Sequence, residues 1–275
     1  MYKIFGSGTC RLLHTFYVGQ NIINSIHSYC GREFHGNNFM GKQKNSRNHI
    51  QFLKYIKGEI DLPVDIKNDF FSAYHIEYEE YKRPKDPDIN LQSLRNEIDT
   101  CDVYLFEIAS IKIQTRDNYC VSDENTTNYL QTVQTKEELI NDLEEIIRVV
   151  GINKKIIFLN HLRLDQFGGG PVIENRETVY WAIYETCQKN PNVYQYDPTL
   201  MVKNKSDYKR YFADPWHYTP EGMNINFNNL YNLIHIAVNN VPNTKEFVNN
   251  TNNKTTILYD SEDEEPDYHI KNLHG

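Results

Sequence analysis

Hydrophobic and polar positions along this chain form short apolar runs that alternate with longer segments of helical periodicity. The short runs cover residues 3–7, 70–77, 103–108, 155–159 and 193–196. One of the longer segments begins near Thr9, and the others cover residues 46–57, 91–98, 135–150, 174–188 and 220–238. Strands that alternate with helices predict βαβ units. We therefore expect an α/β fold, a three-layer α/β/α sandwich built on about five mainly parallel strands.

Several of these helices have recognisable start and stop signals. Thr135 and Glu138 form a capping-box pattern, and Gly151 follows the last apolar turn of the same helix. Pro220 suits the first position of the final helix, and Ser46 is expected to cap the helix that it opens. Residues 115–134 are polar and show neither helical nor strand periodicity, so we expect a loop there.

One domain of residues 1–240 is expected, followed by a tail or linker. Residues 241–275 are rich in Asn and Thr and then acidic, a composition typical of disorder. The 275 residues carry a formal net charge of −8, which does not favour nucleic-acid binding. The N-terminus does not have the pattern of a signal peptide, and no apolar run has transmembrane length. We expect a cytoplasmic protein without membrane contact, and the oligomeric state is left open.

Cysteine and histidine spacing disfavours a disulfide framework and a metal site. The five cysteines are odd in number and widely spaced, without a Cys-x-x-Cys pair. The histidines show no pair at the spacing of metal ligands. We therefore expect reduced thiols and no bound metal.

The nine residues from Asp214 to Gly222, Asp-Pro-Trp-His-Tyr-Thr-Pro-Glu-Gly, are the most informative stretch of the chain. Asp214 and His217 are spaced so that one short loop presents an imidazole with a carboxylate behind it. Such a carboxylate fixes the tautomer of the imidazole and stabilises its protonated form, so the pair can activate a nucleophile. The spacing predicts a general base at His217, oriented by Asp214.

Other polar residues lie where the predicted strands end. Cys10 follows the first strand, Glu107 lies near the end of the third, and Asn160 follows the fourth. Ligand sites of open parallel sheets lie beyond the carboxyl ends of the strands. We expect these three residues and the Asp214–His217 loop to meet at that edge.

This order of features resembles the SGNH/GDSL hydrolase superfamily over roughly residues 1–240. In that superfamily a Gly-Asp-Ser run follows the first strand, an Asn follows a later strand, and an Asp-x-x-His lies near the C-terminus. Asp214-Pro-Trp-His217 matches the last block, and Gly8-Thr-Cys10 occupies the place of the first. Asn160 matches the Asn block, although Gly-x-Asn-Asp is absent. The resemblance implies a flavodoxin-like sheet and acyl chemistry.

Two residues compete for the role of nucleophile. Gly8-Thr-Cys-Arg11 is similar to the Gly-Ser-Cys-Phe-Ala run of the GSCFA family and to the Gly-Asn-Cys-Gln run of a capsule-polysaccharide acetyltransferase family. Cys10 at the start of a helix, beside Arg11 and His217, is placed to form a thiolate. Ser7 is the alternative if the true motif is Gly6-Ser7. A third interpretation makes Cys10 a small packed residue.

Several further residues are candidates for contacts to substrate. Asn160, or its rival His161, is expected to stabilise an oxyanion, and Trp216 to form a pocket wall. Glu107 lies inside an apolar strand, where an unpaired carboxylate is costly, so we expect a pair with Arg11 or Lys112, with a substrate contact as the alternative.

Basic residues ahead of a predicted helix suggest a site for a phosphate group. Lys42 and Arg47 precede or open the second helix, where the phosphate of an acyl-coenzyme A or of a sugar nucleotide can bind. A solvated basic face is the alternative interpretation. Arg176 follows the glycine loop 168–170 and starts another helix, which makes it a weaker candidate for a position near the catalytic pocket.

Three functional hypotheses follow. The first is an acyltransferase that moves an acetyl or similar group from acetyl-CoA or another acyl-CoA to a sugar hydroxyl or amine. The second is an esterase or deacetylase of the same fold, acting on a glycan or a small ester. The third is a non-catalytic binding module on the same scaffold. The resemblance to the polysaccharide acetyltransferases favours the first.

Overall fold

The computed structural model describes residues 2–9, 11–12, 15, 26–28, 43–70, 95–96, 98–121, 129–163, 174–203, 205–214 and 217–240. Within these ranges a five-stranded sheet has the order β2-β1-β3-β7-β8, and every neighbouring pair is parallel. The strands are β1 (Tyr2–Ser7), β2 (Ile26–Ser28), β3 (Val103–Ile108), β7 (Lys155–Asn160) and β8 (Val193–Tyr196). The expected α/β class is confirmed. The segment from residue 241 to 275 lies outside the described residues.

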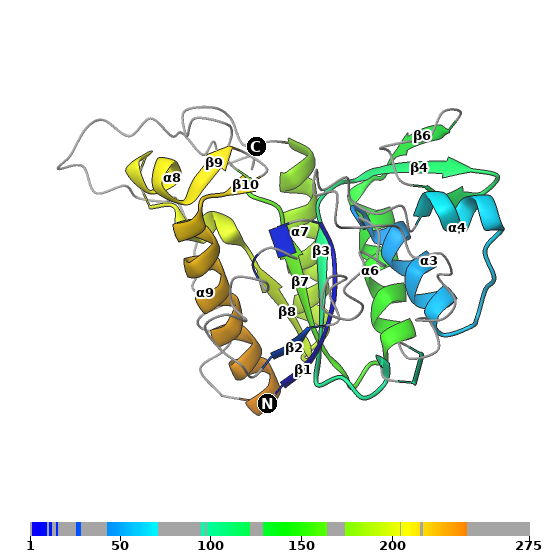
Figure 1. The fold of residues 1–275 in the computed structure, drawn as a ribbon, viewed down its shortest axis with the longest axis horizontal. Coiled ribbons are helices and arrows are strands. Elements are labelled where there is room, and N and C mark those ends of the chain that lie inside the picture. The colour runs from blue at the N-terminus through cyan, green and yellow to red at the C-terminus, as the bar shows by residue number, and fades with distance from the viewer. Residues whose placement is uncertain are drawn as a thin grey trace, which may run out of the picture.

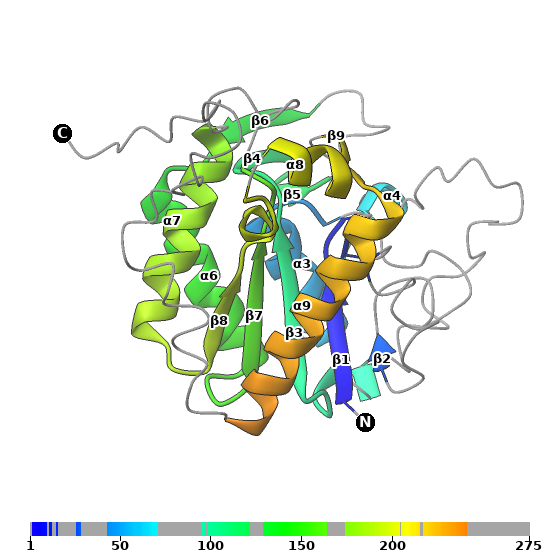
Figure 2. The same ribbon diagram turned by 90° about the vertical axis from the view of Figure 1, so that its left-hand side faces the viewer.

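Helices cover both faces of this sheet (Figures 1 and 2). One face carries α3 (Ser46–Ile56), α6 (Lys136–Val150) and α7 (Glu174–Lys189), and the other carries α9 (Pro220–Asn239). Successive strand residues point to opposite faces, so Phe5 and Phe106 pack in the first core while Ile4 and Leu105 pack in the second. Glu107 therefore shares the α9 face of β3. No described helix combines the length and the apolar character that a membrane crossing requires.

The strand predicted over residues 70–77 lies outside the described residues except for Phe70, and the sheet contains a short strand, β2, that the sequence did not predict. Residues 64–70 form the helix α4 (Val64–Phe70), and residues 71–77 lie outside the described ranges. The remaining strand is β2, which pairs with β1 at the edge of the sheet. β2 has only three residues, too few to show a strand period in the sequence.

The helix boundaries follow the sequence signals closely. Both hydrogen bonds of the capping box join Thr135 and Glu138, and the N–H of Gly151 bonds back to the end of α6. Thr219 caps α9 ahead of Pro220. The predicted cap at Ser46 is wrong by one residue, because Asn45 accepts the bond from the N–H of Asn48.

Parts of the loop expected over residues 115–134 belong to a small antiparallel sheet, while residues 122–128 lie outside the described ranges. β4 (Lys112–Arg116) pairs with β5 (Tyr119–Cys120) on one side and with β6 (Leu130–Val133) on the other. Asp117 and Asn118 both have positive φ, at 51° and 69°, as a two-residue hairpin turn requires. All four residues of β6 are exposed. Neither face of this strand is buried, so its sequence, Leu-Gln-Thr-Val, does not need to alternate between polar and apolar residues.

A second small sheet holds the Asp-x-x-His segment. α8 (Lys205–Tyr211) leads directly into β9 (Phe212–Asp214), which pairs with β10 (His217–Tyr218) ahead of α9. We expected a loop here, and the structure forms a short hairpin. In Figure 1 this hairpin and the β4–β6 sheet stand on opposite sides of the edge where the parallel strands end.

Candidate functional site

Asp214 and His217 form the hydrogen-bonded pair that their spacing predicts. The Nδ1 atom of His217 lies 2.8 Å from Oδ2 and 3.0 Å from Oδ1 of Asp214. Oδ1 also accepts a bond of 2.8 Å from the backbone N–H of His217. A carboxylate only accepts, so Nδ1 carries a proton, and in the neutral imidazole the lone pair is on Nε2. The side chain of His217 is 53% exposed, and water reaches it directly. Trp216 lies outside the described residues.

The hairpin is held by a small core and a close helix contact. Phe212 and Tyr218 pack in a cluster with Leu162 at the end of the sheet. At the start of α9, a Cβ added to Gly222 would lie 1.9 Å from the carbonyl oxygen of Tyr211, which is backbone and cannot yield cheaply. Only glycine allows α9 to approach α8 this closely. These contacts give Asp214 and His217 a fixed frame despite their exposure.

A buried ion pair follows the first strand. Glu107 accepts bonds at Oε2 from the N–H and the hydroxyl of Thr9, at 2.8 and 2.7 Å, and at Oε1 from Arg11 at 3.1 Å. The side chains of Arg11 and Glu107 are each 4% exposed. Arg11 is one of the two partners that the sequence suggested for Glu107. Gly8 permits the approach, because a Cβ there would lie 2.7 Å from the Cβ of Glu107.

The start of the first helix and the hairpin meet at the same edge of the sheet. The guanidinium carbon of Arg11 lies 5.9 Å from the centre of the Tyr218 ring, one residue from His217. Cys10 stands in the chain between Thr9 and Arg11, but its own position lies outside the described residues. The structure thus brings the neighbours of Cys10 and of His217 together, and the role of Cys10 stays a prediction.

Ser7 is paired with a histidine other than His217. Its hydroxyl lies 2.9 Å from Nδ1 of His49, and Nε2 of His49 lies 2.9 Å from the carbonyl oxygen of Glu107. The carbonyl only accepts, so His49 is protonated at Nε2 and Ser7 donates to Nδ1. Ser7 and His49 are 3% and 0% exposed. The Ser7 side chain points to the α3 face, away from the Glu107 side chain, so the structure does not support Ser7 as the partner of His217.

His49 is expected to make the protein less stable as the pH falls. Burial lowers the pKa of His49 from 6.5 to about 4. Between these values the unfolded chain takes up a proton that the folded protein does not. The free energy of unfolding therefore decreases as the pH falls from 6.5 to 4, by roughly 3 kcal/mol. Urea unfolding at several pH values in this range measures the slope.

The matched variant for this measurement is His49→Gln. Glutamine keeps an N–H for the carbonyl of Glu107 and an oxygen for Ser7, and it does not titrate. Its unfolding free energy should therefore change less with pH than that of the natural protein. Equal pH slopes in the two proteins would show that His49 is not buried in its neutral form.

Asn160 is the last residue of β7, and His161 follows it. The Oδ1 atom of Asn160 accepts a bond of 3.0 Å from Gln195, which also donates to the carbonyl of Tyr180 in α7. Among the described residues, Nδ2 of Asn160 and Nδ1 of His161 have no hydrogen-bond partner, although both side chains are buried. Asn160 faces α7, whereas Glu107 faces α9. The oxyanion role of either residue stays a prediction.

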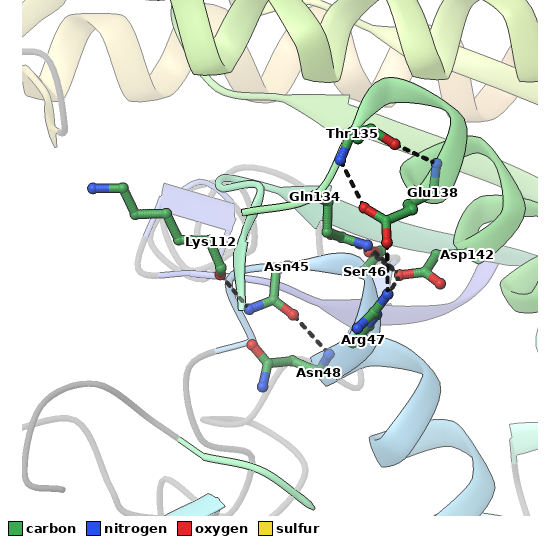
Figure 3. A network of polar contacts seen from close by, with 9 residues as sticks. All are labelled: Asn45, Ser46, Arg47, Asn48, Lys112, Gln134, Thr135, Glu138 and Asp142. Carbon is green, nitrogen blue, oxygen red and sulfur yellow. Dashed lines mark hydrogen bonds and ion pairs between the residues drawn. The ribbon is translucent and has the colours of Figure 1, made fainter. Parts of the chain in front are cut away.

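The basic residues expected to bind a phosphate are engaged or undescribed. Arg47 lies 3.4 Å from Asp142 and 3.8 Å from Glu138, both on α6. Figure 3 shows these pairs within a network that includes Ser46, which bonds Asp142 at 2.7 Å. Lys42 lies outside the described residues. The two acidic partners neutralise Arg47, so its side chain supports the sequence argument for a coenzyme A phosphate only weakly.

A cavity of about 470 Å³ opens beside β8. Tyr196, Asp197, Tyr211 and Asn229 line it together with apolar side chains from α9. Tyr211 directly precedes β9, so the cavity adjoins the element that carries Asp214. A cavity of this size with aromatic, apolar and polar walls has room for a small molecule.

Sequence reasoning missed several residues of this edge. His49 carried no signal because it looked like a helix residue, and its partner Ser7 lies 42 positions away. Thr9 and Gln195 likewise form their hydrogen bonds with residues distant in the chain. Within the described ranges, His, Cys, Asp and Glu do not form a group of three that could hold a metal ion.

Comparisons with known proteins add only weak structural similarity. No protein-family model matches the chain, and no curated protein matches it significantly. Among solved structures, a carbohydrate esterase family 3 protein from Talaromyces cellulolyticus matches with a TM-score of 0.37 and 13% identity, over 88% of this chain and 100% of that chain. A similarity of this size carries neither residues nor mechanism from that esterase to this protein.

Proposed function

We propose that the protein is an ester hydrolase that removes an acyl group from a sugar or another small alcohol. The Asp214–His217 pair carries the proposal, because the carboxylate holds Nδ1 at 2.8 Å and leaves Nε2 as a base. Its exposure favours hydrolysis, since water can reach the imidazole without a conformational change. The adjoining cavity offers room for the alcohol part of the ester.

The proposed nucleophile is Cys10. His217 Nε2 takes the thiol proton as the sulfur attacks the ester carbonyl, and the departing alkoxide takes that proton when its C–O bond breaks. Water, deprotonated by His217, then attacks the thioester, and the sulfur leaves with the proton returned by His217. Asp214 stabilises the imidazolium that forms in both steps.

Acyl transfer from acetyl-CoA or another acyl-CoA is the second candidate. The cysteine at position 10 favours it, because a thiolate exchanges readily with a thioester donor. In that reaction a sugar hydroxyl or amine replaces water as the acceptor. A non-catalytic binding module is the remaining alternative.

The test compares the two reactions with the purified full chain. We expect release of 4-nitrophenol from 4-nitrophenyl acetate, loss of this release in Cys10→Ala, and normal release in Cys187→Ala, which changes a thiol on α7 instead. If the protein acetylates an amino sugar with acetyl-CoA and does not hydrolyse the ester, the hydrolase proposal is refuted in favour of acyl transfer. No turnover in either assay would favour the binding module and overturn both enzymatic proposals.

A further inference from the structure

Arg11 has more hydrogen-bonding capacity than its buried neighbours use. Its Nη2 donates to Oε1 of Glu107, while Oε2 of the same carboxylate is occupied by both donors of Thr9. The Nη1 atom of Arg11 is buried and has no hydrogen-bond partner among the described residues. A buried donor of this kind costs free energy unless something accepts from it.

A second buried arginine lies at the same edge. Arg176, near the start of α7, is 7% exposed and donates to the carbonyl of Leu162, two residues beyond β7. Burial and the nearby charge of Arg11 lower the pKa of Arg176 to about 10, and Glu107 acts in the opposite direction. Arg11 lies over the ring of Tyr218, and Tyr218 packs in one apolar cluster with Leu162, whose carbonyl Arg176 contacts, so both guanidinium groups lie in the same part of this edge.

The neighbouring groups favour an anion between these arginines. Asp197 is engaged by Arg163, at 2.9 and 3.0 Å, and by the N–H of Thr199. His161 is buried next to Leu162, and its Nδ1 has no partner in the described part of the chain. Glu107 is the one carboxylate that contacts Arg11 among the described residues. The unpaired Nη1 of Arg11 is a buried donor that an anion would satisfy.

We propose that Arg11 and Arg176 bind an anionic group, a carboxylate or a phosphate, at the carboxyl end of β3 and β7. Arg11 presents Nη1 to the anion while Glu107 holds the other half of its guanidinium in place. His161 can donate to the same group. The identification of this anion as part of the ester substrate rests on the proposed function, because Tyr218 connects Arg11 to the His217 hairpin.

The binding step can be measured without catalysis. The full chain is titrated calorimetrically with inorganic phosphate and, separately, with acetate, in chloride buffer of constant ionic strength. We expect one of the two anions to bind, which also distinguishes phosphate from carboxylate. Arg11→Lys keeps the charge beside Glu107 but loses the second nitrogen, and it should weaken binding about 10- to 100-fold.

Two further variants keep the result interpretable. Arg176→Lys should also weaken binding of the anion. This variant replaces Arg11→Lys in the test if circular dichroism shows that Arg11→Lys does not fold. Arg210→Lys is the control, because Arg210 is exposed on α8 and paired with Glu221. Absence of binding for both anions, or equal affinity in the natural protein and in both site variants, would overturn the proposal. Equal weakening in Arg210→Lys would do so too.

The substrate part is tested by comparing a neutral with an anionic ester. If the anion belongs to the substrate, kcat/KM for mono-4-nitrophenyl succinate should exceed that for 4-nitrophenyl acetate about tenfold or more, and Arg11→Lys should reduce this ratio. Equal kcat/KM values would refute the substrate assignment. Anion binding without turnover of any ester would refute the ester hydrolase and leave the anion site standing. Ester turnover without anion binding would refute the anion site and leave the ester hydrolase standing.

Discussion

Replacing His217 with alanine is expected to lower kcat/KM for ester hydrolysis about 10²- to 10⁴-fold, the range that a positioned general base contributes. The change removes an imidazole whose Nδ1 is held by the carboxylate of Asp214 at this edge of the sheet. The side chain is 53% exposed and packs in none of the three apolar cores. The folded structure should therefore survive, and the thermal midpoint should stay within a few degrees of the natural value.

Two comparisons make this result specific. Asp214→Asn keeps the size of the side chain but removes the charge that stabilises the imidazolium, so its activity should also fall strongly. His235→Ala removes an exposed histidine from α9 and should leave activity unchanged. Full activity in His217→Ala would end the role of this histidine as a base.

Replacing Glu107 with alanine is expected to lower the free energy of unfolding by about 3–5 kcal/mol. The variant leaves the guanidinium of Arg11 buried without its counter-charge, and it removes the acceptor for both donors of Thr9. Denaturant unfolding at neutral pH measures the loss. We also expect weaker anion binding, because Arg11 would no longer be held in one orientation.

The control is a carboxylate with similar partners in a different environment. Glu145 bonds Lys54 and Arg148 near the surface, where its side chain is 28% exposed. Glu145→Ala should therefore cost at most about 1 kcal/mol, as exposed ion pairs do. The double variant Glu107→Leu with Arg11→Met removes both buried charges and should be more stable than Glu107→Leu alone. If Glu107→Ala loses no more free energy of unfolding than Glu145→Ala, the buried charge of Arg11 does not need Glu107 as its counter-charge.

The edge of the sheet offers an exposed and a buried environment for two separate tasks. Asp214 and His217 lie in the exposed hairpin, where proton transfer to and from water is possible. Arg11 and Glu107 lie underneath, excluded from water, where a charge exerts its greatest influence on a bound group. An ester whose carbonyl meets His217 and whose anionic end reaches Arg11 would use both environments.

The elements that the amino-acid order predicted well are those whose signals are local. β3 and β8 have the bounds expected from their apolar runs, and α6 begins and ends at its capping box and glycine. The hydrogen bonds between Asp214 and His217 also form within four residues of chain. A short stretch of chain contains every group that such a feature needs, so no distant contact is required to recognise it.

Contacts between distant segments decided the remainder. β6 is exposed at all four positions and is a strand only because β4 lies beside it. β2 has three residues and is a strand only because β1 lies beside it. Ser7 could be read as a nucleophile until α3 brought His49 to within 2.9 Å of its hydroxyl. Arg11 and Glu107 meet across 96 positions. A residue type states which bonds a side chain can make, and only folding determines which partner, and how much water, lies within reach of it.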